Sequence, residues 1–351
     1  MTAIMNSTVR AQKGFTLVEM MVALAISFVI LLGLSVAFYT GSVTRKETDR
    51  AARQIENGRY AMQVLSDDIK LAGYLAEFNP NLLPLPGAKP DPCATAIATL
   101  KSALPLHVQG YDKPAGGAIP TCITDLKAGT DVIVVRRAST CIVGAADCDA
   151  TIAGAPYFQA SLCGSGTELS SSNVQDYYVL DASSGTFNKH KKDCGTVAAT
   201  RRFRTHIYFV ANNDNAGDGI PTLKRAELGA GGFTIVPIAE GVENVQIEYG
   251  VDTNGDGSPD TFTADPDAFT YAACPTAPCV VTWRDVMAVR IYVLARNTEA
   301  SPAYTDTKTY TLGLNADGSA NTLATFNDSI KRHLFEGQVR INNASARRLV
   351  P

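Results

Sequence analysis

The sequence predicts an α+β protein, with one long N-terminal helix followed by a mainly antiparallel β-sheet domain. No proline occurs before position 80, so nothing of that kind interrupts a continuous helix over residues 15–72. Proline and glycine are frequent after residue 79, where short β-rich segments alternate with turn residues. Most connections between these segments are too short for helical crossovers, which favours antiparallel pairing.

The first part of the predicted helix, residues 15–40, is apolar and contains a single charged residue, Glu19. At 1.5 Å per residue this run spans about 39 Å, enough to cross a bilayer. The basic residues Arg10 and Lys13 precede it and no acid does, so we expect the leader to stay in the cytoplasm. The small Gly14 lies before the run, so a peptidase acting there would remove the leader and keep the helix.

Beyond residue 40 the predicted helix becomes polar and continues to about Ala72, with Gly73 near its end. Apolar and small residues recur there at alternating spacings of four and three, which indicates one buried face. We expect this face to pack on the protein's own sheet, whereas residues 15–40 face lipid or other helices. The predicted face consists of Ala51, Ile55, Gly58, Met62, Leu65, Ile69 and Ala72.

The remainder of the chain is predicted to contain loops over residues 74–130 and strands beyond them. A short helix is expected at Asn327–Leu334, before the last strand. The expected strands are Asp131–Ala138, Gln175–Leu180, His206–Ala211, Thr234–Ile238, Val245–Val251, Val286–Ala295, Lys308–Leu314 and Phe335–Ile341.

All eight cysteines follow the apolar run, which is typical of disulfides formed in an oxidising compartment. A metal site is the alternative, but neither C-x₂-C spacing nor paired histidines occur. The sequence leaves 105 pairings open; one of them closes two short local loops, Cys141–Cys148 and Cys274–Cys279, and leaves Cys93–Cys122 and Cys163–Cys194 as the other two pairs. The eight are Cys93, Cys122, Cys141, Cys148, Cys163, Cys194, Cys274 and Cys279.

Charge and motifs argue against two classes of function. The formal net charge of −3 provides no strong basic field, so no nucleic-acid partner is predicted. The G-x-S-x-G, H-E-x-x-H and P-loop patterns do not occur, so we expect no enzymatic activity.

One acidic segment, residues 252–260, follows the pattern D-x-N-x-D-G-x-x-D of an EF-hand calcium loop. Thr263 stands where a bidentate glutamate is expected, and no helical pattern flanks the loop. A polar hairpin turn is the alternative, since Asn-Gly and Asp-Gly are strong turn formers. The calcium ligands would be the side chains of Asp252, Asn254, Asp256 and Asp260 and the backbone carbonyl of Ser258.

The segment Gly14-Phe15-Thr16-Leu17-Val18-Glu19, placed before an apolar run, resembles the class III signal of type IV pilins and pseudopilins. The resemblance implies that a prepilin peptidase cuts between Gly14 and Phe15 and that Phe15 is then N-methylated. It also implies that Glu19 faces the N-terminal amine of a neighbouring subunit during assembly.

Further segments resemble the PilW family of minor pilins. The resemblance implies an α+β pilin fold, in which a long helix packs at its outer half on an antiparallel sheet. It implies a cleaved leader at residues 1–14, a transmembrane and assembly helix at 15–40, its periplasmic half at 41–73 and a disulfide-containing β-rich domain at 74–351. The segments are Glu56–Arg59, Ala72–Tyr74, Gly241–Asp260, Val286–Arg296 and Lys331–Phe335.

The function implied by this family is assembly of a type IV pilus. A minor pilin primes polymerisation and lies at or near the tip; its partners would be the prepilin peptidase, other minor pilins, the major pilin and a PilY-type tip adhesin. The chain would cross the inner membrane once, with its C-terminal domain periplasmic, and become extracellular in the pilus. Two alternatives are a type II secretion pseudopilin and a tip-located adhesive module built on residues 80–200.

Overall fold

The computed structural model describes residues 14–146, 148 and 150–349. The predicted leader, up to residue 13, lies outside the described residues. The chain divides into two compact units, Met1–Ala51 and Ala52–Pro351.

The long helix is present as predicted. Helix α1 (Leu17–Lys70) is continuous and begins and ends within two residues of the expected bounds. After it, the backbone N–H of Gly73 donates to Arg136 O, and Gly73 adopts a positive φ of 71°. That conformation is easily reached by glycine and ends the helix sharply.

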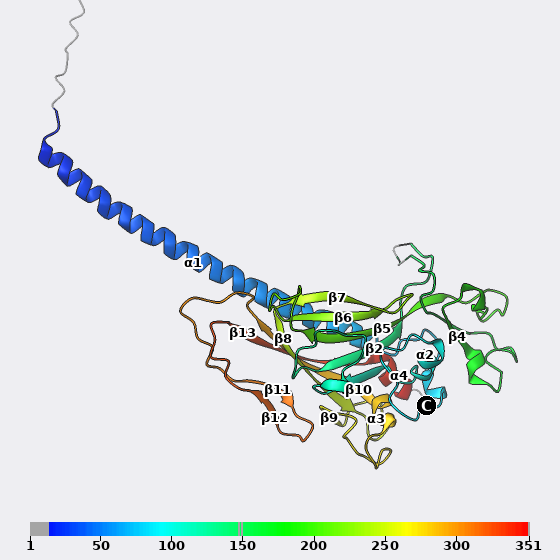
Figure 1. Ribbon diagram of the computed structural model, residues 1–351. Coiled ribbons are helices and arrows are strands. Elements are labelled where there is room, and N and C mark those ends of the chain that lie inside the picture. The colour runs from blue at the N-terminus through cyan, green and yellow to red at the C-terminus, as the bar shows by residue number, and fades with distance from the viewer. Residues whose placement is uncertain (1–13, 147, 149, 350–351) are drawn as a thin grey trace, which may run out of the picture. The chain divides into compact units, whose positions relative to one another are not determined.

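The second unit consists mainly of strands (Figure 1). The strands are β1 (Val108–Tyr111), β2 (Val132–Ala138), β3 (Tyr157–Ala160), β4 (Tyr178–Asp181), β5 (Thr200–Ala211), β6 (Thr222–Leu228), β7 (Phe233–Glu240), β8 (Val242–Val251), β9 (Thr261–Thr263), β10 (Val286–Arg296), β11 (Tyr310–Leu314), β12 (Ala320–Leu323) and β13 (Arg332–Arg340). The shorter helices are α2 (Ile97–Ser102), α3 (Val280–Arg284) and α4 (Asn342–Leu349), with 3-10 turns η1 (Pro80–Leu82), η2 (Gly116–Ala118), η3 (Val174–Tyr177) and η4 (Ser184–Thr186).

The strands form two main sheets. A seven-stranded sheet has the order β1-β2-β5-β3-β4, with β6 added on β5 and β7 on β6. A four-stranded sheet has the order β13-β10-β8-β9, and β11 and β12 form a separate hairpin. Every pairing between these strands is antiparallel, so the predicted α+β class is confirmed.

One predicted element is wrong, and several strands were missed. The helix expected at Asn327–Leu334 does not form, because Arg332, His333 and Leu334 already pair with β10 as the start of β13. Strands β1, β3, β9 and β12 have only three or four residues, too few to show a period. In β6 the charged residues hide the alternation of buried and exposed positions.

The C-terminal half of α1 packs one face against residues of both sheets. Ala61, Leu65 and Ile69 are fully buried and join one hydrophobic core with residues of β1, β2, β5, β8, β10 and β13. The predicted face is therefore largely correct, but Ile55 is 39% exposed and lies outside it. Two polar residues that the pattern did not include, Gln54 and Asp68, are buried on this face instead.

Asp68 forms the polar centre of the helix–sheet contact. One carboxylate oxygen accepts from Arg137 Nε at 2.6 Å. The other lies 2.6 Å from His206 Nδ1 and accepts from the Tyr208 hydroxyl at 2.8 Å. Arg137 lies on β2 and the other two on β5, so one helical side chain is bonded to two neighbouring strands.

Ionisation favours this arrangement. Burial alone would raise the pKa of Asp68, but the hydrogen bond and charge of His206 and the charge of Arg137 hold that pKa well below its usual range. Burial lowers the pKa of His206, against the hydrogen bond and charge of Asp68, which raise it. Because the pKa of Asp68 is depressed on folding, its contribution to stability is present above the ordinary aspartate pKa and is lost as the pH falls.

The eight cysteines form four disulfides. The pairs are Cys93–Cys122, Cys141–Cys148, Cys163–Cys194 and Cys274–Cys279. This pairing contains the two short local loops named above, and its bridges link segments with little regular structure.

The structure predicts that Asp68→Asn destabilises the fold by about 3 kcal/mol, because it leaves the nearly buried Arg137 guanidinium without its counter-charge. Unfolding of the full chain in detergent micelles, followed by circular dichroism in denaturant, measures this loss. Asp67→Asn is the matched control: Asp67 pairs with Lys70 on the surface, where removal costs less than about 1 kcal/mol. Equal losses in the two variants would contradict the role given to Asp68.

Candidate functional site

The N-terminal end of α1 is capped by reciprocal hydrogen bonds between Thr16 and Glu19. The backbone N–H and the hydroxyl of Thr16 both donate to Glu19 Oε2 at 2.9 Å. The Glu19 N–H donates back to Thr16 Oγ1 at 3.2 Å. This is a capping box, with Thr16 in the N-cap position and Glu19 three residues later. The spacing Thr-x-x-Glu signals it in the sequence, but the sequence reasoning gave Glu19 a role in assembly only.

Gly14 and Phe15 precede this cap, and no other part of the described chain crowds them. A Cβ built on Gly14 would meet nothing within 4 Å, and Phe15 is 90% exposed. The predicted cleavage site is therefore accessible in the structure.

The helix beyond the cap presents apolar side chains that nothing in the described chain covers. Phe28, Leu32 and Phe38 are 70%, 70% and 80% exposed, and the residues between Leu17 and Thr40 are exposed throughout. By length and composition α1 is able to cross a membrane. Exposed apolar surface of this extent calls for lipid or other apolar helices around it.

The outer half of α1 approaches β13 closely at a glycine. A Cβ added to Gly58 would overlap the ring of Phe335. On the next turn, a Cβ on Gly337 of β13 would lie 2.9 Å from Met62 Cε. The helix and the strand therefore share a contact in which each provides a glycine opposite a large side chain of the other.

Two amide side chains fix the position of α1 along the sheet. Gln54 Nε2 donates to the carbonyls of Ala295 at 2.8 Å and Lys331 at 3.0 Å. Asn57 Nδ2 donates to Glu240 O at 3.1 Å. Glu240 and Ala295 lie at or next to the ends of their strands, and Lys331 immediately precedes β13.

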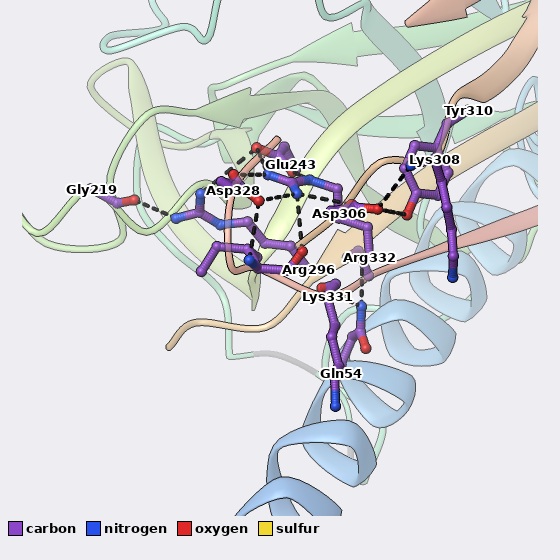
Figure 2. Close-up of polar contacts among 12 residues, drawn as sticks. Gln54, Gly219, Glu243, Arg296, Asp306, Lys308, Tyr310, Asp328, Lys331 and Arg332 are labelled. Carbon is purple, nitrogen blue, oxygen red and sulfur yellow. Dashed lines mark hydrogen bonds and ion pairs between the residues drawn. The ribbon is translucent and has the colours of Figure 1, made fainter. Parts of the chain in front are cut away.

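The residue Arg332, at the start of β13, is the centre of a buried ionic network (Figure 2). Its side chain is 1% exposed and bonds to Glu243, to Asp306 at 3.0 Å and to Asp328 at 2.7 Å. The guanidinium also lies 3.6 Å from the centre of the Phe326 ring. Its donors thus meet carboxylates from β8 and from both ends of the segment that carries β11 and β12.

A second arginine and a tyrosine complete this network. Arg296 lies 3.7 Å from Glu243 and donates to Gly219 O at 2.6 Å. The Tyr310 hydroxyl donates to Asp306, which is fully buried. The bonds and charge of Arg332 hold the pKa of Asp328 below its usual range. The network therefore ties residues 297–331 back onto β8.

The predicted calcium loop is folded on its own backbone. Asp252 is buried and accepts from the N–H groups of Gly255 at 2.6 Å and Gly257 at 2.9 Å. Asp260 accepts from the hydroxyl and N–H of Thr253, and these bonds lower its pKa. Asn254 and Asp256 each accept from an N–H two residues later in the loop.

A cationic side chain already lies at this loop. Arg348 of α4 donates to Asp252 at 3.2 Å and also pairs with Asp285. Among the described residues, no three carboxylate, imidazole or thiolate side chains converge as metal ligands would. The donors in this arrangement fit a hydrogen-bonded turn better than a metal cage, and calcium binding stays a prediction.

The calcium hypothesis predicts that millimolar Ca²⁺ raises the melting temperature of the full chain in detergent, relative to chelator. At a hundredfold excess over Kd the gain in stability is about 2.7 kcal/mol. Asp256→Ala should abolish the rise, because Asp256 is exposed and its carboxylate is not needed for packing. If the wild type shows neither a rise nor heat in calorimetry, the loop is a turn only.

Comparison with known proteins matches two parts of the chain. Residues 207–343 match the family described as type IV pilus-assembly protein W, PilW. Residues 9–35 match the prokaryotic N-terminal methylation motif. No curated protein matches this chain significantly.

Among solved structures, the chain is similar to a type IV-like pilin from Thermus thermophilus. The identity is 16%, over 55% of this chain and 86% of that one, with a TM-score of 0.23. A TM-score this low carries no argument about the fold.

The two family matches contain the capped helix start and most of the residues that seat α1, among them Phe335, Gly337 and the Arg332 network. The family matched by residues 207–343 is described as a pilus-assembly protein. With the apolar helix, the antiparallel sheets and the four disulfides, the two matches support a type IV pilin-like protein of the PilW family of minor pilins.

Proposed function

We propose that this minor pilin primes pilus assembly and is located at or near the tip. The observation that carries the proposal is the apolar surface of α1 from Leu17 to Thr40, which is exposed along its whole length. A helix of this kind is stable when surrounded by lipid, and equally when packed among other apolar helices. The same apolar surface of α1 can therefore contact lipid while the protein is in the membrane and other helices once it is assembled.

The proposed processing starts from the accessible Gly14. A prepilin peptidase cleaves between Gly14 and Phe15 and methylates the new amine, which lies one residue before the capping threonine. The body of the protein is periplasmic and the removed leader cytoplasmic. Support comes from the four disulfides, all of which lie beyond the apolar run.

The proposed partners are other minor pilins, the major pilin and a PilY-type adhesin. The protein acts by assembly and not by catalysis. We favour a pilus over a type II secretion system because the matched family is described as a pilus-assembly protein.

The first test concerns cleavage. Mass spectrometry of the chain from isolated pili or membranes should find an N-terminus at N-methyl-Phe15. A bulky residue in place of Gly14 should block cleavage, whereas Gly14→Ala should be tolerated. An intact Met1 start in cells with an active peptidase would contradict the proposal.

The second test separates the two roles of Glu19. Glu19→Gln keeps the shape and the capping box, since glutamine serves at the third helical position as well as glutamate. It removes the charge that would meet the amine of an adjacent subunit. We expect the variant to be cleaved and inserted normally but to enter pili poorly.

Thr16→Ala is the matched control, because it removes the cap hydroxyl and keeps the Glu19 charge. It should cost about 1 kcal/mol of helix stability and leave incorporation unchanged. Immunoblotting of sheared pili against membranes measures both. Normal incorporation of Glu19→Gln refutes an intermolecular charge pair that assembly needs.

A further inference from the structure

Two adjacent cations, Arg45 and Lys46, follow the apolar run of α1. Residues 15–44 contain a single charged side chain, that of Glu19, so these two are the first basic side chains after the run. Both are exposed, and Tyr39, near the end of the run, is 71% exposed. An aromatic ring followed by basic side chains is typical of the place where a transmembrane helix leaves the hydrocarbon for the headgroup layer.

The position of this pair along α1 matches the thickness of a bilayer. From Leu17, where the helix begins, to Arg45 the axis rises about 42 Å at 1.5 Å per residue. A bilayer is about 40–45 Å thick when both headgroup layers are included. When the start of an upright helix lies in one headgroup layer, the two cations therefore lie in the other.

The acids that follow do not cancel the charge of the pair. Glu47 already accepts from Arg50, with Oε1 and Nη1 2.7 Å apart. Asp49 is exposed, but it follows Lys46 by about 4.5 Å along the axis and so lies farther from the apolar run. The side-chain charge nearest to the end of the run is therefore positive.

The two side chains suit a phosphate group. A guanidinium donates two parallel N–H groups to phosphate, and an ammonium binds it as a compact charge. The long methylene stems of both residues let the charged ends reach the phosphate layer while the stems stay on apolar surface. A phosphatidylcholine headgroup carries its own cation beside the phosphate, whereas a phosphatidylglycerol headgroup has a net negative charge. A pair of cations therefore favours the anionic lipid.

We propose that Arg45 and Lys46 bind the headgroups of anionic phospholipids in the leaflet where α1 leaves the membrane. This contact fixes the depth of α1 in the bilayer and gathers anionic lipid around it. It has to break when the helix leaves lipid for other helices, so it opposes extraction of the subunit. The proposal rests on the membrane-inserted state proposed above and holds for either orientation of the chain.

Spin-labelled lipids test this selectivity. The full chain is reconstituted in phosphatidylcholine vesicles with a trace of spin-labelled phosphatidylglycerol or spin-labelled phosphatidylcholine, and electron paramagnetic resonance gives the fraction of label immobilised at the protein. At roughly 0.1 M salt we expect the phosphatidylglycerol label to associate at least about threefold more strongly than the phosphatidylcholine label. Because the attraction is ionic, added salt should lower this ratio.

The variant Arg45→Gln/Lys46→Gln keeps two long polar side chains and removes both charges. It should lower the ratio at least about twofold, and Arg45→Gln alone should lower it by part of that amount. Arg59→Gln is the control for the single charge, because Arg59 is exposed and lies about 20 Å beyond Lys46 along α1, about two Debye lengths at this salt concentration. It should leave the ratio unchanged. The basic leader is present in every protein compared.

Flotation of the vesicles is measured first, so that insertion and lipid selectivity are judged separately. A chain that does not float with the vesicles contradicts the membrane-inserted state and this proposal with it. A chain that floats but binds both labels equally refutes the lipid selectivity alone, as does an equal loss in Arg45→Gln and Arg59→Gln. Displacement of the phosphatidylglycerol label by millimolar inorganic phosphate, but not by chloride of equal ionic strength, would make the pair a site for free phosphate and not for lipid.

Discussion

Burial of one face of the outer half of α1 against both sheets is the constraint on which the rest of the structure depends. A helix inserted there loses water around its polar side chains, so each one on the buried face needs a partner inside the protein. Asp68 finds three, and Gln54 finds two carbonyls. Glycines at 58 and 337 set the distance between helix and strand. The sheets therefore contact the helix both through apolar side chains and through hydrogen bonds to particular polar residues.

The region of the family match contributes strands that contact α1, and the region before it contains most of the disulfides. Residues 207–343 contain β13, the Arg332 network and the strands β8 and β10, which together form one side of the seat of α1. Three of the four disulfides lie before residue 207. There the disulfides link loops that the sheets do not hold.

The sequence predicted the elements that have a clear period and missed those that tertiary contacts create. The apolar run and the heptad-like face of α1 follow from spacing alone. Asp68 was missed because an aspartate on a helix is usually solvated, and its partners lie on strands more than sixty residues away. Asn327–Leu334 was expected to be a helix, but the carboxylates around Arg332 and the pairing with β10 hold the start of β13 extended. The capping box at Thr16 was visible in the sequence as the spacing Thr-x-x-Glu.

The contacts of α1 at Gln54, Asn57 and Asp68 have a mechanical consequence. They lie along about 21 Å of one helix, given a rise of 1.5 Å per residue. A force applied along the helix axis, as when a subunit is drawn out of a bilayer, loads these hydrogen bonds together and not one after another. Separation by shear then requires all of them to break in a single step, while Gly58 and Phe335 oppose sliding by one turn. The contacts of Gln54, Asn57 and Asp68 thus resist displacement of the helix along its axis relative to the sheets.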